Sequence, residues 1–186
     1  MCYIVKKSRC GLPKTRRSAF MIRFSPKKLR DFNKHLFAET TFDAFLVPEA
    51  HFVTSFRTDF EGKLPPAGTA DAAADSEGKA VPADLSCVSW KELRPIALQL
   101  VRGQVPPKSF SIVMKLPEDQ AESLFAGGSP AESAGQIPGF YLNIRYAKEE
   151  LMLTSGCMQK TFSLDKTWEK AWDKHIEDFL SRLGLI

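Results

Sequence analysis

A strand-like run that passes through a proline into a short helix occurs twice in this chain of 186 residues. This repeat restricts the possible folds more than any other feature. In the second copy, "FSIVMKLPEDQAESLF", Pro117 separates the two parts, and Glu118 and Asp119 stand in the first helical turn, where the helix dipole favours acids. The apolar residues before the proline alternate, as a half-buried strand requires: Phe110, Ile112, Met114 and Leu116.

The first copy is "FMIRFSPKKLRDFNKHLF", residues 20–37. Ser25 can cap its helix, and Pro26 occupies the first helical position, where a missing N–H does no harm. The helix that follows carries these apolar residues: Leu29, Phe32, Leu36 and Phe37. The same order of elements is therefore predicted at both places.

Further strand-like runs follow each helix, two within residues 42–64 and three within residues 140–164. The chain therefore reads as β-α-β-β followed by β-α-β-β-β, a degenerate internal duplication. Strands that are neighbours in sequence usually pair with each other. We therefore expect an α+β fold with largely antiparallel sheets.

A third helix is predicted in "SWKELRPIALQLVRG", residues 89–103. Ser89 and Glu92 have the spacing of a capping box, and Gly103 is a stop signal. Pro95 removes a backbone donor, so the helix either kinks there or begins there.

The last helix spans residues 165–184, with Asp165 as its cap and Gly184 at its end. Its apolar side either packs on the core or docks a partner. That side is formed by Trp168, Trp172, Ile176, Phe179, Leu180 and Leu183.

Charge is distributed unevenly along the chain. Residues 1–20 hold six basic residues and no acid, whereas residues 21–186 hold the other 20 basic residues and all 22 acidic ones. We expect the leader to be disordered or to come from a misassigned start codon, with a basic nucleic-acid-binding arm as the alternative. Residues 21–186 are expected to form one domain.

Two segments interrupt this domain. Residues 65–84 are rich in alanine and lack aromatic side chains, which predicts a flexible insertion. Residues 126–139 have the same character and are predicted to form a mobile loop. No apolar run is long enough to cross a bilayer, so no membrane contact is expected.

Four cysteines are present, and none of them forms a C-x-x-C pair: Cys2, Cys10, Cys87 and Cys157. The leader lacks the continuous apolar stretch of a secretory signal. We therefore expect reduced thiols and a cytoplasmic location.

With this duplication, the chain resembles a domain of the DNA sliding clamps, the ring-shaped polymerase processivity factors. The resemblance lies in "MIRFSPKKLRDF", "SFSIVMKLPEDQAESLF" and "FYLNIRYAKEELMLTSGCMQKTFSL". It implies two β-α-β-β-β units with the helices on one side of the sheets. A clamp ring contains six such domains, so this chain would have to form a hexamer to close one. The extra C-terminal helix and the acidic helix at residues 118–125 depart from the clamp pattern.

The chain also resembles a group of small uncharacterised bacterial proteins. They share a "WKELRPI" helix and a "TFSLDK…W…AW" ending.

A non-enzymatic binding or scaffolding module is the function that this reading favours, with DNA or a protein as its partner and with homo-oligomers possible. Four basic residues on the first helix are the candidate nucleic-acid contacts, since such a helix can lie along a phosphate backbone. They are Lys27, Lys28, Arg30 and Lys34. The alternative is an ordinary solvated helix face.

Two other functions stay open from the sequence. The first is a receptor for a small ligand or peptide, with Trp90, Trp168 and Trp172 bordering a groove. The second is an enzyme that uses Cys157 as nucleophile with His175 as base. The three histidines are scattered without metal spacing, and no phosphate-binding glycine motif occurs, so no metal or cofactor is expected.

Overall fold

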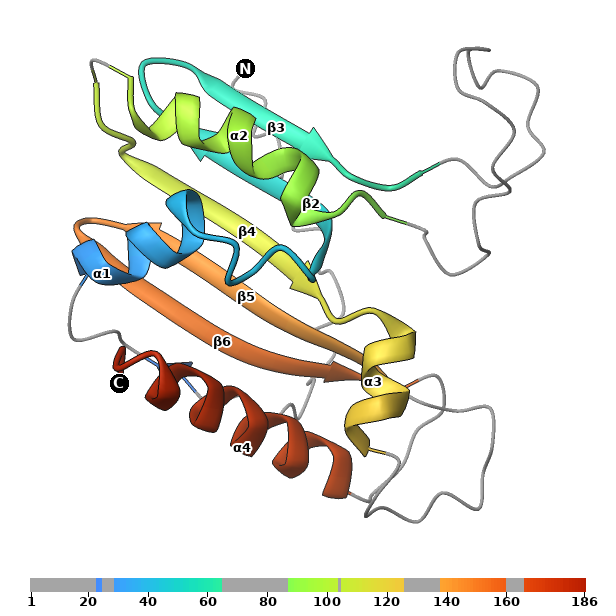
Figure 1. The fold of residues 1–186 in the computed structure, drawn as a ribbon. Coiled ribbons are helices and arrows are strands. Elements are labelled where there is room, and N and C mark those ends of the chain that lie inside the picture. The colour runs from blue at the N-terminus through green and yellow to red at the C-terminus, as the bar shows by residue number, and fades with distance from the viewer. Residues whose placement is uncertain (1–22, 25–28, 65–86, 104, 126–137, 160–165) are drawn as a thin grey trace, which may run out of the picture.

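The six strands of the described residues form one antiparallel sheet, in the order β1-β6-β5-β4-β2-β3 (Figure 1). The computed structural model describes residues 23–24, 29–64, 87–103, 105–125, 138–159 and 166–186. The leader, the insertion at 65–84, most of the loop at 126–139 and the "KTFSL" run at 160–164 lie outside these residues. The strands are β1 (Arg23–Phe24), β2 (Leu46–Val53), β3 (Arg57–Glu61), β4 (Ser109–Lys115), β5 (Gly139–Ala147) and β6 (Glu150–Met158).

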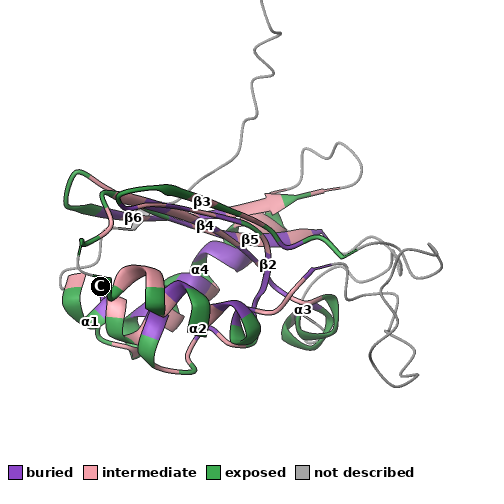
Figure 2. Ribbon diagram, turned by 90° about the horizontal axis from the view of Figure 1, so that it is seen from above, coloured by how far each residue is buried: buried purple, intermediate pink, exposed green. Residues whose placement is uncertain are grey.

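All helices of the described residues lie on the same side of the sheet (Figure 2). This arrangement confirms the expected α+β class with antiparallel pairing, with helices on one side and with an additional C-terminal helix. The helical elements are α1 (Leu29–Asn33), the π-helical turn η1 (Lys34–Ala38), α2 (Trp90–Val101), α3 (Glu118–Phe125) and α4 (Thr167–Arg182).

The core forms between the sheet and these helices because the strands bury every second side chain. The alternation predicted for residues 110–116 is confirmed on β4, and β5 and β6 repeat it. Full burial of such an aliphatic or aromatic side chain contributes about 1.5–3 kcal/mol. The buried sheet residues include Ala50, Phe52, Phe110, Ile112, Met114, Phe140, Leu142, Ile144, Leu151 and Leu153.

The aromatic side chains of the core converge on Phe37 in η1. Its ring lies edge-on to Phe110 with 5.5 Å between centroids, and it also contacts Trp90 at 6.0 Å and Phe52 at 6.5 Å. Tilted and edge-to-face pairs are the favoured geometries for aromatic rings. This π-helical turn is thus held against β2, β4 and α2 at once.

The order strand–helix–strand–strand occurs twice, as β1-α1-β2-β3 and as β4-α3-β5-β6, with α2 between the copies. The strand pairing of the two copies differs. β4 pairs directly with β5, whereas β1 pairs with β6 at the far edge of the sheet and has no pairing with β2. Between β1 and β2 the chain crosses the helix side of the sheet through α1 (Figure 1).

The ends of α2 and α4 differ in how well the sequence predicts them. Ser89 is the N-cap of α2, but its hydroxyl makes no capping hydrogen bond, so the predicted capping box is wrong. The helix runs through Pro95 without starting there. Gly184 ends α4 as predicted, with φ of +67° and a bond from the Leu185 N–H to the Leu180 carbonyl oxygen at 3.0 Å.

A shift in the register of β2 lies beside a glycine that directly follows the neighbouring strand β3. The register between β2 and β4 shifts between Leu46 and Glu49. Gly62 donates its N–H to the Pro48 carbonyl oxygen at 2.9 Å, and a Cβ atom at Gly62 would lie 1.9 Å from the Val47 carbonyl oxygen. Only a residue without a side chain fits there.

Within the described ranges, no helix combines the length and the apolar character that crossing a membrane demands.

Candidate functional site: the open face of the sheet

One side of the sheet is turned away from the helices (Figure 2). Its residues are mostly polar and partly or fully exposed. We call this surface the open face. No described helix covers it. It comprises Glu49, His51, Val53, Arg57, Asp59, Glu61, Ser109, Ser111, Val113, Lys115, Tyr141, Asn143, Arg145, Ala147, Glu150, Met152, Thr154 and Gly156.

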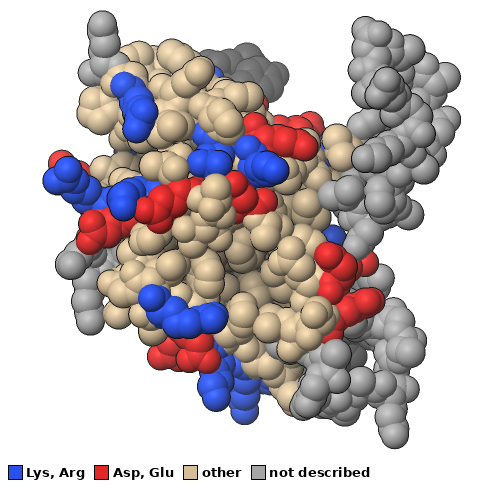
Figure 3. Space-filling model, viewed as in Figure 1, with Lys and Arg blue, Asp and Glu red and all other residues tan. Residues whose placement is uncertain are grey.

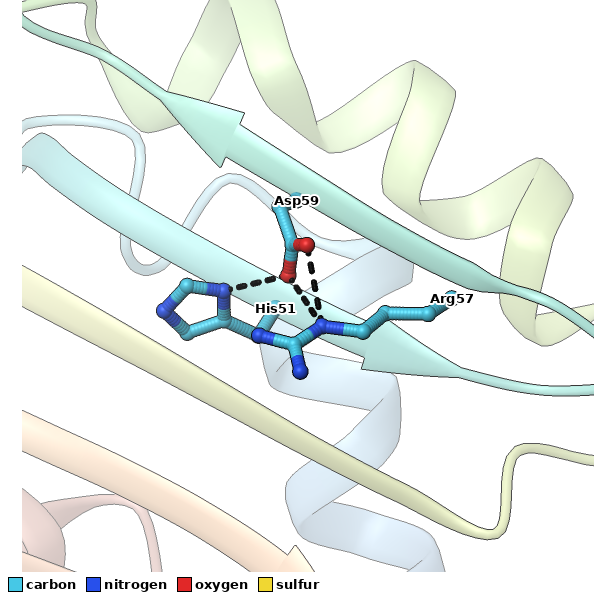
Figure 4. Close-up of polar contacts among 3 residues, drawn as sticks. All are labelled: His51, Arg57 and Asp59. Carbon is cyan, nitrogen blue, oxygen red and sulfur yellow. Dashed lines mark hydrogen bonds and ion pairs between the residues drawn. The ribbon is translucent and has the colours of Figure 1, made fainter.

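Three of these residues form a polar group on β2 and β3 (Figure 4). The Nδ1 atom of His51 lies 2.7 Å from Oδ1 of Asp59, and Nε of Arg57 lies 2.9 Å from both carboxylate oxygens of Asp59. The hydrogen bonds from Arg57 and then from His51 lower the pKa of Asp59. Asp59 is therefore an ionised acceptor.

The tautomer of His51 follows from this contact. An ionised carboxylate only accepts hydrogen bonds, so Nδ1 of His51 carries a proton. The other ring nitrogen, Nε2, makes no hydrogen bond within the described residues. The side chain of His51 is 39% exposed, so a ligand can reach its ring.

Strand register extends this group across the sheet. His51 is the direct partner of Ser111 on β4, and Ser111 is the direct partner of Arg145 on β5. Cross-strand partners on one face have neighbouring side chains. Asp59, His51, Ser111 and Arg145 therefore form one line over four strands, which we call the cross-strand row. Arg145 is exposed and makes no ion pair in the described part of the chain.

Sequence reasoning missed every member of this row. The signal was present, since His51 and Asp59 stand symmetrically about Ser55 at the centre of a short turn. A hairpin centred on Ser55 pairs them directly. Without that hairpin register, the two residues are simply eight positions apart in the sequence.

The charges on the open face are mixed. Strands β2 to β6 carry four acids (Glu49, Asp59, Glu61, Glu150) and three bases (Arg57, Lys115, Arg145) on this face, and Arg23 on β1 is the register partner of Thr154. Glu49 and Glu61 are direct cross-strand partners of like charge. The face is therefore close to neutral overall.

Two of the predicted nucleic-acid contacts, Arg30 on α1 and Lys34 on η1, fall on the opposite side of the sheet. Arg30 is exposed, and Lys27 and Lys28 lie outside the described residues. Nζ of Lys34 lies 2.8 Å from Oε1 of Glu39, which raises the pKa of Lys34 and lowers that of Glu39. Lys and Arg are mixed with Asp and Glu over this side (Figure 3).

Glu39 reaches Lys34 because of the π-helical turn. The Glu39 N–H donates to the Lys34 carbonyl oxygen at 3.0 Å and ends η1. The same carboxylate also contacts Nδ1 of His35 at 2.5 Å. The cations of this helix are thus partly compensated by a local acid.

The thiol proposed as a nucleophile lies between β6 and α4. Burial, and then the carboxylates of Glu169 and Asp173, raise the pKa of Cys157 to about 12. The thiolate is the nucleophilic form of cysteine. Cys157 is therefore a protonated thiol near neutral pH. The proposed base, His175, stacks on Trp172 at 5.6 Å, and burial lowers its pKa.

The tryptophans that were expected to border a groove are parts of the core. Trp90 and Trp172 are fully buried, and Trp168 packs against Phe140. The indole N–H of Trp90 donates to the Leu36 carbonyl oxygen at 2.9 Å, and that of Trp172 donates to the Tyr141 carbonyl oxygen at 2.9 Å. Trp90 and Trp172 therefore cannot line a ligand site, which corrects this part of the receptor hypothesis.

Residues 35–185 match the model of a family of unknown function, DUF5721. The chain belongs to this family. Comparisons with curated proteins and with solved structures give no match. This family match confirms the predicted resemblance to a group of uncharacterised proteins.

In this member of the family, the "WKELRPI" segment lies in α2 and contacts the turn that follows η1. Arg94 contacts Asp43 through two pairs of atoms, with Nε at 2.8 Å and Nη2 at 3.1 Å from the carboxylate oxygens. It also donates to the Ala38 carbonyl oxygen at 3.3 Å. Asp43 thus holds Arg94 in a partly buried ion pair. Together with the Trp90 bond, this contact gives the segment a structural role.

Proposed function

We propose that this protein is a non-enzymatic binding module that engages a protein partner through the open face of its sheet. The observation that carries this proposal is the distribution of the helices. All described helices lie on one side, so none of them occupies the other face of a five-strand-wide surface (β3, β2, β4, β5 and β6). A sheet that presents polar and small side chains is suited to a flat interface of standard size.

The composition of the open face favours a protein over a nucleic acid. A nucleic-acid backbone needs an excess of cations, and the charges of the open face are close to balanced. Uncharged side chains such as Ser111, Val113 and Asn143 lie on the inner strands β4 and β5 of this face. Protein interfaces combine such uncharged groups with polar and charged ones. The protonated thiol of Cys157 supports a function without cysteine nucleophilic catalysis.

Cross-linking from each side of the sheet tests this proposal. A photoreactive residue at Val113 reports on the open face, and the same residue at Ile96 on α2, which is 49% exposed, is the matched control on the helix side. We expect one discrete adduct from position 113 and none from position 96. The adduct is identified by mass spectrometry, and the purified partner is titrated against wild type and Val113→Arg. Equal affinity for the two proteins would refute the proposal.

DNA binding and a clamp-like assembly are two further proposals. The order of elements, repeated as strand–helix–strand–strand, supports a likeness to sliding-clamp domains. A solution mass equal to six chains supports a ring, and a monomer argues against one. For DNA, a gel shift that is unchanged by Arg30→Gln and by neutralising Lys27, Lys28 and Lys34 removes this helix from consideration.

A further inference from the structure

We propose that the cross-strand row is a recognition site for a phosphoryl group carried by a side chain of the protein partner. This inference rests on the proposed function, because it names the group that the open face recognises. The row offers three donors of different chemistry side by side: the imidazole of His51, the hydroxyl of Ser111 and the guanidinium of Arg145.

The order of the row places the donors around a common point above Ser111. His51 and Arg145 stand on the strands either side of β4, so their Cα atoms are separated by two strand spacings, about 10 Å. Both side chains are longer than that of Ser111. A tetrahedral oxyanion seated on the Ser111 hydroxyl can therefore accept hydrogen bonds from both of them.

Asp59 and Arg57 prepare this site. Asp59 accepts from Nδ1 of His51, which fixes the ring and leaves Nε2 as the second donor once the ring is protonated. Arg57 holds Asp59 through Nε and leaves its terminal nitrogens unused within the described residues. The carboxylate is thus compensated by Arg57 and repels an incoming anion less than an unpaired acid would.

A phosphoryl group fits this donor set better than a carboxylate does. A phosphoryl group carries three terminal oxygens in a tetrahedral arrangement and a charge near −2. The imidazolium, the hydroxyl and the guanidinium can each bind a different oxygen. A carboxylate has only two oxygens, both in one plane, so two of the three donors would have to share one oxygen.

Histidine NMR provides the test, with the full chain and with phenyl phosphate as probe. The chain has three histidines, and His35 and His175 lie on the helix side as internal references. At about pH 6, we expect a saturable shift of the His51 ring signals alone. Arg145→Gln should weaken binding about 10-fold or more, and Ser111→Ala should weaken it several-fold. Arg30→Gln, the same change on the other side of the sheet, should have no effect.

Three outcomes overturn the proposal. The first is a His51 shift no larger than sodium chloride of equal ionic strength produces. The second is equal affinity in Arg145→Gln and wild type. The third is acetate binding as tightly as phenyl phosphate, which would identify a carboxylate site instead. None of these outcomes touches the cross-linking result at Val113, so failure of the phosphoryl site is distinguishable from failure of the open face as a binding surface.

Discussion

The hydroxyl of Ser155 on β6 donates a hydrogen bond to the carboxyl group of Asp173 on α4, in the interior between the strand and the helix. Ser155 is fully buried, and Asp173 is 5% exposed. Burial raises the pKa of Asp173, and the bond from Ser155 offsets this only in part. α4 therefore packs on the sheet with a carboxyl group that resists ionisation.

Asp173→Asn should stabilise the protein by about 1–2 kcal/mol near pH 8, because the amide keeps the Ser155 bond without a buried charge. The folded-state pKa lies above the ordinary value of 3.8. In the wild type, the neutral carboxyl of Asp173 therefore contributes fully to stability below its ordinary pKa. This stabilisation is lost as the pH rises through the folded-state pKa. Urea unfolding between about pH 4 and pH 8 should show a decline in wild type that Asp173→Asn lacks.

The matched control is Asp178→Asn on the same helix, where the carboxylate is exposed. It should leave the difference in stability between low and neutral pH unchanged. If the free energy of unfolding depends on pH in the same way in Asp173→Asn and Asp178→Asn, the buried carboxyl is not the source of the pH dependence.

Gly62→Ala should destabilise the fold by about 2 kcal/mol or more, because its Cβ would overlap the Val47 carbonyl oxygen and the β2 backbone cannot move freely. Gly103→Ala is the control, since the nearest atom to its Cβ would be the Leu100 carbonyl oxygen at an ordinary 3.5 Å. Thermal unfolding of both variants measures the difference. Equal melting temperatures would contradict the close approach at Gly62.

Arg94→Met should cost about 1–3 kcal/mol, because it leaves the partly buried carboxylate of Asp43 without its cation. The double variant Arg94→Met with Asp43→Asn should recover part of the loss, since the unpaired charge is then gone. A four-member thermodynamic cycle by chemical unfolding measures this coupling. A coupling energy near zero would show that the ion pair of the "WKELRPI" segment adds nothing to the packing of α2.

Alkylation of Cys157 by iodoacetamide should be slow at neutral pH, in a variant in which the other cysteines are replaced. With a pKa of about 12, the thiolate fraction should grow about tenfold per pH unit up to about pH 10 without levelling off. Glu169→Gln should raise the rate, because that carboxylate opposes thiolate formation. A rate that reaches a plateau below about pH 9 would instead mean an accessible, reactive thiol.

The sequence by itself determined the elements and most of the core. Alternation gave β4, and helical spacing gave α4 with Trp172, Ile176 and Leu180 inside. These predictions succeeded because such patterns are local: each depends on the pitch of one helix or the pleat of one strand. Proline and glycine signals succeeded for the same reason, as at Pro117 and Gly184.

Only the tertiary structure decided which elements are neighbours. β1 beside β6, the contact of Arg94 with Asp43, and the row from Asp59 to Arg145 each join residues far apart in the chain. Even the ion pair between Lys34 and Glu39, which are close in sequence, depends on the π-helical turn η1. Phe37 in this turn packs against Phe110 in the core. Strand order and register set these contacts, and they follow from the free energy of the whole packed sheet, which no single segment encodes.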